Sequence, residues 1–207
     1  MTRTPAWSGV AFSDGTDGDL RNDIGARSLF SARLGLPSRW ATVHQVHGSG
    51  VLQVSRPGEA GDADGLWTTT SGLPVAVFTA DCFGVVLHAE SAVGVAHAGW
   101  RGVRAGVVSN VIAAMTASGH YPQRAAMGPG IRPCCFEVGP EVAGEFGGFV
   151  TETSWGTTSV DLAAALRAQL GDIEQWDAAV CTLHEDGSFS HRRDQTPARM
   201  AAVGWLP

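Results

Sequence analysis

Lysine is absent from this 207-residue chain, so all 14 of its basic residues are arginines, and only 16% of the residues are charged. We attribute the missing lysine to codon usage and infer no special guanidinium chemistry from it. Asp and Glu together number 20, which gives a net charge of -6. A negative net charge is the opposite of what a nucleic-acid surface needs, so we expect no nucleic-acid partner.

Long apolar runs are also missing. The first segment, MTRTPAWSGVAFSDG, contains no apolar core of signal-peptide length, and no window approaches the length of a membrane span. The four cysteines, at positions 82, 134, 135 and 181, form no CxxC pair, which disfavours a disulfide framework. We therefore expect a soluble, cytoplasmic protein without a membrane partner.

Enough apolar residues are present to bury one core, and no linker interrupts the chain, so we expect a single domain over residues 1–207. Because helical and strand patterns alternate irregularly, they indicate a mixed α/β or α+β domain. The patterns predict helices at 23–34, 102–118 and 161–170. They predict strands at 40–46, 51–55, 74–80, 83–89, 93–98, 177–183 and 200–206, with a hairpin-like connection at 48–50.

Cys82 and His97 flank two apolar runs of strand length that are joined by a tight turn. A turn centred between residues 89 and 90 sets Cys82 opposite His97 in an antiparallel hairpin, with the backbones about 5 Å apart. A thiolate and an imidazole in that position can share a metal ion. The alternative is that Cys82 packs as a small apolar residue and His97 is a satisfied strand-end histidine.

The segment HQVHG offers a third ligand. His44 and His47 are three residues apart and point to opposite faces of a strand, so one of them is a bystander. His47 is favoured because it precedes Gly48, where the backbone can approach another segment closely. Two imidazoles and one thiolate leave the fourth position of a zinc ion open, which is typical of a catalytic site. Copper accepts the same ligands but needs a weak axial ligand such as Met, and no Met is near in sequence.

Arg101, in the segment GWRG, lies where a buried strand turns into a predicted helix, so it can help to bind phosphate or another anion. It can equally cap the turn and pair with a carboxylate such as Asp81. Asp81 itself, beside Cys82, is a candidate acid or base or a residue that orients an imidazole. Asp62 and Asp64 can likewise act as acid or base or orient an imidazole, and the alternative is that they only form a turn.

The remaining cysteines look structural from the sequence. Cys134 and Cys135 are adjacent, which is a poor geometry for joint metal binding, so we expect both to be packing residues. His184 has no partner at a suggestive spacing. In the alternative of a binding module, the zinc ion only joins parts of the chain and needs four protein ligands. Cys181 is then the residue that can supply the fourth ligand and close the site.

Six motifs follow one another between about residues 45 and 194. They are QVHG, ADGLWTT, TADCFGVVL, VAHAGWRG, GPGIRPCCFEVGPEV, and CT followed by FSHRRD. In this order they resemble the laccase-domain family, which is also described as polyphenol-oxidase-like or YfiH-type. The pair TADC and HAGWRG is the most specific part of the resemblance.

This resemblance implies a layered fold in which two β-sheets are flanked by helices, with zinc held by His47, Cys82 and His97. It implies phosphorolysis of adenosine, inosine and 5'-methylthioadenosine, with phosphate as co-substrate and adenosine deamination as a second activity. Other descriptions of the family imply a copper-dependent polyphenol oxidase or an enzyme that edits peptidoglycan precursors. The oligomeric state does not follow from the sequence, and a monomer is compatible with it.

The sequence departs from the family pattern at three places. The early segment FSTRxGGVS, followed by SLNLG, is shortened here to FSDGTDGDLR, so the family's Arg and Asn have no secure counterpart. His191 replaces the Tyr of SYRR. TPAR replaces the closing TGR and keeps Arg199. These departures predict a changed substrate range.

Overall fold

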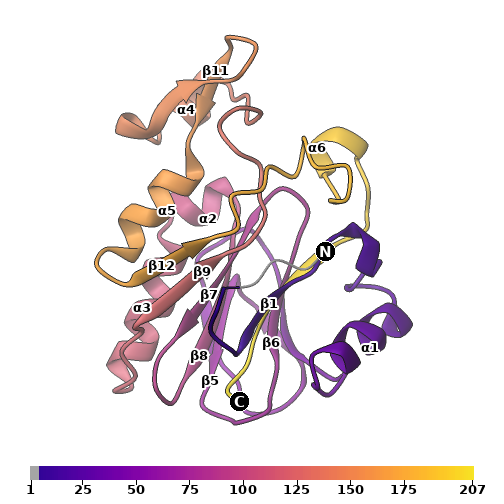
Figure 1. The fold of residues 1–207 in the computed structure, drawn as a ribbon. Coiled ribbons are helices and arrows are strands. Elements are labelled where there is room, and N and C mark those ends of the chain that lie inside the picture. Colours follow the sequence, from indigo (N-terminus) through magenta and orange to yellow (C-terminus); the bar gives the residue numbers. More distant parts are fainter. Residues whose placement is uncertain (1–4) are drawn as a thin grey trace.

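Two mixed β-sheets make up most of the computed structural model, which describes residues 5–207 (Figure 1). The five-stranded sheet has the order β1 (Val10–Phe12), β13 (Met200–Gly204), β6 (Val75–Thr79), β2 (Ala41–His44), β4 (Gly58–Asp62). The six-stranded sheet has the order β12 (Glu174–Asp177), β9 (Arg124–Met127), β7 (Phe83–His88), β8 (Val93–Ala98), β5 (Gly65–Thr68), β3 (Val51–Gln53). Strands β10 (Val150–Glu152) and β11 (Thr158–Val160) form a separate hairpin.

The helices are α1 (Ile24–Arg33), α2 (Trp100–Arg104), α3 (Val107–Ala117), α4 (Pro140–Ala143), α5 (Leu162–Leu170) and α6 (His191–Asp194), with 3₁₀ turns at Gly15–Asp17 and Gly147–Phe149. Helix α4 lies against the β10–β11 hairpin, away from the two large sheets (Figure 1). Helix α1 packs on the five-stranded sheet, whereas α3 and α5 pack on the six-stranded sheet. No helix among residues 5–207 has both the length and the apolar character needed to cross a bilayer.

Alternation of side chains along the strands produces three apolar layers. On β6, Val75 and Val77 face the other sheet, whereas Ala76 and Phe78 face α1. The same alternation on β8 directs Val93 and Val95 between the sheets and the alanines toward α3. The expected architecture, two sheets flanked by helices, is therefore confirmed.

Several elements lie where the sequence predicts them. Helix α1 begins after Asp23, whose side chain accepts hydrogen bonds from two backbone amides of the first turn. Asp161 caps α5 by accepting a hydrogen bond from one backbone amide, that of Ala164. The strands predicted at 74–80, 83–89, 93–98 and 200–206 correspond to β6, β7, β8 and β13.

Three predicted elements are wrong. Strands β2 and β3 lie in different sheets, so residues 48–50 connect sheets and do not form a hairpin. The helix predicted over 102–118 is two helices, since Gly106 has a φ of +75° and ends the first one. Residues 178–183 do not continue a strand: β12 ends at Asp177, and a turn follows at 182–184.

Candidate metal centre

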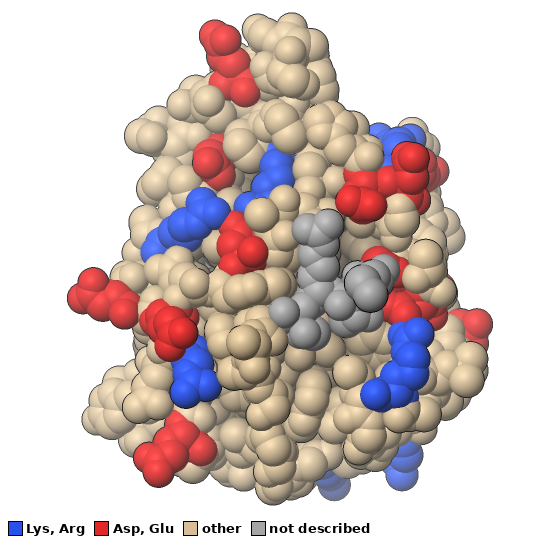
Figure 2. Space-filling view, in the orientation of Figure 1, with Lys and Arg blue, Asp and Glu red and all other residues tan. Residues whose placement is uncertain are grey.

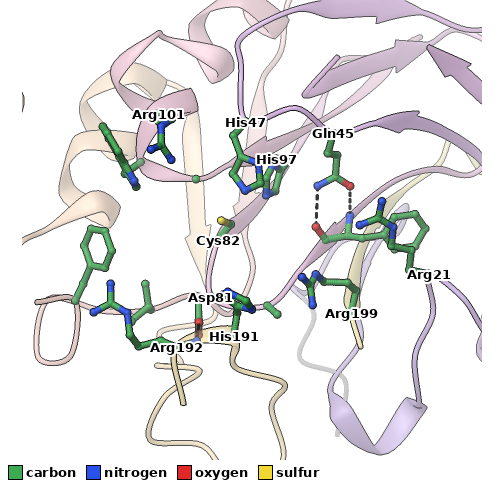
Figure 3. A pocket seen from close by; sticks show the side chains of 16 residues that line it. Arg21, Gln45, His47, Asp81, Cys82, His97, Arg101, His191, Arg192 and Arg199 are labelled. Atoms are coloured by element: carbon green, nitrogen blue, oxygen red, sulfur yellow. Dashed lines mark hydrogen bonds between the residues drawn. The ribbon is translucent and has the colours of Figure 1, made fainter. Parts of the chain in front are cut away.

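Three side chains from separate parts of the chain converge where the two sheets meet. His47 comes from the connection between β2 and β3, Cys82 from the connection between β6 and β7, and His97 from β8. One ligand atom of each lies within 4.8 Å of those of the other two. In Figure 3 the two imidazoles and the sulfur point toward one another. The structure thus brings together the three residues that the sequence selected, and they form a possible metal-binding cluster.

The predicted strand register was wrong by two residues, although the predicted proximity was right. The β7–β8 ladder pairs Gly84 with His97 and Phe83 with Ala98, so its continuation sets Cys82 opposite Gly99. A two-residue offset preserves the face to which a side chain points, so Cys82 and His97 remain on the same side. Gly99 is needed here, because a Cβ atom would lie 2.9 Å from the Cys82 sulfur.

Asp64 orients both histidines of the centre. It is completely buried, and its carboxylate accepts a hydrogen bond from Nδ1 of His97 at 2.7 Å, which leaves Nε2 of His97 free to bind a metal. The same carboxylate accepts backbone N–H bonds from residues 46, 47 and 48, at 3.2, 3.0 and 2.6 Å. This loop carries His47, whose φ of +60° is a left-handed conformation. The interpretation of Asp64 as an orienting residue fits these contacts, whereas Asp62 lies on the surface and pairs with His44.

The cluster favours the thiolate form of Cys82. Burial alone would raise the pKa of this thiol, but the imidazoles of His97 and His47 lower it to about 6. Burial likewise disfavours a charged His97, but the Cys82 thiolate and the Asp64 carboxylate raise its pKa to about 9. The centre therefore holds a thiolate on Cys82 and a proton on His97, and a bound metal ion would displace that proton.

Asp81 lines the same pocket but its carboxylate is fully engaged. One oxygen accepts from the Thr182 hydroxyl at 2.6 Å, and the other accepts from the backbone N–H of Arg192 at 2.6 Å. These bonds fasten the first turn of α6 beside the pocket. The geometry suits a positioning residue better than an acid or base.

Arg101 forms no ion pair with any carboxylate of residues 5–207. Its guanidinium lies over the Trp100 ring at 4.3 Å and borders the pocket. The alternative in which it pairs with Asp81 is therefore wrong. A cation that is stacked but unpaired remains available to an anionic ligand.

The pocket beside the centre has a volume of about 310 Å³, which is within the range of small-molecule sites (Figure 3). Four arginines of the described part of the chain line it, although the protein as a whole is acidic. The lining comprises Arg21, Gln45, His47, Phe78, Ala80, Asp81, Cys82, His97, Gly99, Trp100, Arg101, Ile131, Phe136, His191, Arg192 and Arg199.

Sequence reasoning missed several of these residues. The shortened segment FSDGTDGDLR, for which no counterpart of the family's Arg was expected, ends in Arg21 at the pocket. Gln45 exchanges two hydrogen bonds of 2.8 Å with the backbone of Phe78 and so joins β2 to β6 at the rim. No spacing rule signals such a contact, because the two residues are 33 positions apart.

Cys181 is not near enough to close this centre. It belongs to a second group of possible ligands in the described chain, together with Cys134, Cys135 and His184. The sequence predicts that the adjacent cysteines only pack and that His184 lacks a partner. The structure instead places both cysteines and His184 within reach of one metal ion.

Comparison with known proteins places these features in a wider context. A family model described as multi-copper polyphenol oxidoreductase laccase matches residues 3–207. A purine nucleoside phosphorylase from Streptomyces griseus is 39% identical over 227 residues, covering 98% of this chain and 92% of that protein. Another from Deinococcus radiodurans is 37% identical, covering 97% and 83%.

The fold matches that of a solved structure. The crystal structure of the hypothetical protein YfiH from Bacillus licheniformis superimposes with a TM-score of 0.86, over 96% of this chain and 92% of that chain. At 23% identity this likeness concerns the fold alone. It agrees with the YfiH-like architecture expected from the motifs.

Proposed function

The chain belongs to the multi-copper polyphenol oxidoreductase laccase family, and from this premise we propose that it is a zinc-dependent purine nucleoside phosphorylase. The observation that carries the proposal is a three-ligand centre that opens into an arginine-lined pocket. The names of relatives that match nearly the whole chain give the substrate class.

The side chains of the centre fit zinc. Two imidazoles and one thiolate are ligands that zinc accepts, and three protein ligands leave one position for a substrate or water. The bond from His97 to Asp64 is the carboxylate–histidine arrangement typical of zinc centres. When bound, zinc would supply a Lewis acid that polarises an oxygen or activates water.

The pocket's own residues suit phosphate and a nucleoside. Arg101 and Arg192 carry guanidinium groups able to bind phosphate oxygens, and Arg192 is held over Phe136 at 5.5 Å. The aromatic side chains of Phe78 and Phe136 offer apolar surfaces for a purine.

In phosphorolysis, a phosphate oxygen attacks the anomeric carbon of the sugar and the bond to the purine nitrogen breaks. The purine leaves with the electron pair and takes up a proton, which gives the sugar 1-phosphate and the free base. The arginines would hold the phosphate against the sugar, and so supply proximity and charge neutralisation. We propose adenosine, inosine and 5'-methylthioadenosine as substrates.

Adenosine deamination is the proposed second activity. Water replaces the amino group on the purine ring, and ammonia leaves. The H-x-E and P-C-x-x-C signature of the familiar zinc deaminases is absent from the sequence, so a different acid or base must serve. His191, which lines the pocket and can both donate and accept a proton, is a better candidate than the engaged carboxylate of Asp81.

Copper-dependent oxidation is the alternative that the family description favours. Reduction of oxygen to water needs several cooperating coppers with many imidazole ligands. Among residues 5–207, only two imidazoles belong to this centre, and no methionine lines the pocket to serve as a weak axial ligand. The ligand set of this centre therefore supports one zinc ion there, in preference to a laccase centre.

The test is to incubate metal-defined protein with adenosine and phosphate and to follow adenine, inosine and ribose 1-phosphate. We expect phosphate-dependent release of adenine by wild type, and its loss in the His47→Asn variant. His44→Asn, which alters a surface histidine three residues away, is the matched control and should remain active. A zinc-loaded wild type that releases no base would disprove the proposal, and muropeptide substrates would then be tested.

The role of Arg101 has its own test. Arg101→Gln should raise the KM for phosphate about tenfold, because the loss of a hydrogen bond to a charged group costs about 1.5 kcal/mol. The KM for the nucleoside should change little. Arg124→Gln, which removes an arginine paired with Glu174 on the six-stranded sheet, is the control. An unchanged KM for phosphate in Arg101→Gln would rule out this role.

A further inference from the structure

A second cluster of soft ligands lies outside the pocket. Cys134 and Cys135 come from the turn after β9, and Cys181 and His184 come from the turn after β12. Their ligand atoms all lie within 4.8 Å of one another. The sulfurs of Cys134 and Cys135 are 3.5 Å apart, and the Cys135 sulfur is 3.2 Å from Nε2 of His184.

The backbone explains how adjacent cysteines reach one point. On a strand their side chains would point to opposite faces. Here the chain forms a tight turn, in which the N–H groups of Cys135 and Phe136 both donate to the Arg132 carbonyl at 2.9 Å. The turn brings the two sulfurs to the same side.

The opposite side of the cluster is a C-x-x-H segment, Cys181-Thr-Leu-His184, folded into a turn. The N–H groups of His184 and Glu185 donate to the Cys181 carbonyl at 3.2 and 3.0 Å. The Cys181 sulfur also accepts a backbone N–H from Arg132 at 3.5 Å. Ligands separated by two intervening residues in a turn are typical of structural zinc sites.

Two of the ligand–ligand distances agree with the edges of a metal tetrahedron, and all of them lie within 4.8 Å. With zinc–sulfur bonds of about 2.3 Å and zinc–nitrogen bonds of about 2.0 Å, a tetrahedron has sulfur–sulfur edges of about 3.8 Å and sulfur–nitrogen edges of about 3.5 Å. The observed 3.5 Å and 3.2 Å are within a few tenths of these values. They are far from the sulfur–sulfur bond length of about 2.05 Å in a disulfide, and all three cysteines are free.

The neighbouring arginine does not oppose a cation at this position. Its guanidinium, on Arg132, is already neutralised by Asp177.

We propose that Cys134, Cys135, Cys181 and His184 bind a second zinc ion in a closed, four-ligand structural site. The ion joins the turn after β9 to the turn after β12. These segments already lie in contact, since Gly130 and Cys181 form a β-bridge. The first turn also carries Ile131 and Phe136, which line the pocket. The second zinc thereby fixes one wall of the pocket without contacting the substrate.

The test is a metal count on the full chain, dialysed under reducing conditions with a weak chelator. We expect two zinc equivalents in wild type and one in Cys82→Ala, because that variant removes a ligand of the first centre only. His184→Ala, at an exposed position outside the apolar core, should also keep one equivalent. The double variant should hold none, and His120→Ala, on a half-buried histidine outside both clusters, should hold two.

Cobalt loading gives a second readout. Cys82→Ala has lost the thiolate of the first centre, so any thiolate-to-cobalt absorption in this variant reports the second site. It should disappear when Cys181→Ala is added. One equivalent in wild type and none in Cys82→Ala would overturn the proposal, as would bound metal that persists without Cys181, or a disulfide within the cluster under reducing conditions. Phosphorolysis depends on the first centre. Phosphorolytic activity is therefore measured separately from the metal content of the second site.

Discussion

Asp64 is the residue on which both histidines of the candidate centre depend, because it holds His97 through the ring and His47 through the backbone. Burial would raise the pKa of this carboxyl, but the bonds from His97 and from the amides of the loop lower it below its ordinary value. Folding therefore favours the charged form of the Asp64 carboxyl. A carboxylate that fixes an imidazole ring typically contributes to metal affinity as much as to structure.

Replacing Asp64 by Asn should weaken zinc binding at the first centre. The amide keeps the size but loses the charge and offers one acceptor oxygen, so we expect the affinity to fall about 10- to 100-fold. Competition with a chelator measures this change. Asp62→Asn, two residues away on the surface, is the control and should leave the affinity unchanged. Equal affinities in wild type and Asp64→Asn would contradict the orienting role.

At the scale of elements, the break between α2 and α3 aims Arg101 at the pocket. A continuous helix over 102–118 satisfies the apolar spacing, but Gly106 adopts a left-handed conformation and caps α3. The short helix α2 can therefore turn independently of α3 and present Trp100 and Arg101 beside the metal ligands.

Gly106→Ala should destabilise the protein by about 1 kcal/mol, because a Cβ atom disfavours the left-handed conformation. The site itself is open, with the nearest atom 3.9 Å from the added Cβ, so strain and not a clash is the cause. Urea unfolding measures the effect. Gly148→Ala, at an open position with negative φ, is the matched control and should be close to neutral. A stabilised Gly106→Ala variant would show that the two helices can merge.

The end of β12 contributes a pH-dependent element. Burial would raise the pKa of Asp177, but hydrogen bonds from Arg132 and the Ala179 amide, with charge from Arg167, bring it below the ordinary value. The carboxylate is thus favoured by folding. Its contribution to stability is present above the unfolded pKa and is lost as pH falls through the lower folded pKa.

We therefore expect the free energy of unfolding to decrease between about pH 5 and pH 2, and Asp177→Asn to flatten this decrease. Denaturant titrations at several pH values measure it. Asp172→Asn, which alters an exposed carboxyl five residues earlier, is the control. A wild-type and an Asp177→Asn profile of the same slope would contradict the assignment.

At the scale of the whole molecule, close approach of the two sheets sets the position of the centre. Gly84 pairs with His97 on β7–β8 and faces β13 of the other sheet. A Cβ atom on Gly84 would lie far inside van der Waals contact with the Cβ of Ala202.

On the face shown in Figure 2, acidic and basic side chains are interspersed, and no continuous basic surface crosses its described atoms.

Gly84→Ala should force the sheets apart and cost about 2 kcal/mol of stability, as overpacking of a core does. Because His97 is its ladder partner, zinc affinity should fall as well. Thermal unfolding and chelator competition measure the two effects. Adding Ala202→Gly removes the obstructing methyl group and should restore part of both losses, whereas failure to restore either would show that the contact is not the cause.

The sequence by itself determined the mixed fold, most strands of the core and the three clustered side chains of the first centre. It could do so because strand alternation and short turns are local, and because even a register error of two residues keeps a side chain on its face. The family motifs selected His47 over His44, where local spacing gave only a preference.

Only the tertiary structure decided which distant segments meet. The second cluster joins residues 134–135 to residues 181–184, and the pocket takes Arg21, Gln45 and Arg199 from opposite ends of the chain. Such contacts depend on strand order and on turns that redirect side chains, and neither follows from periodicity. For the same reason the sequence offered Cys181 only as a conditional fourth ligand of the first centre, whereas the packing of the two turns brings it beside Cys134, Cys135 and His184.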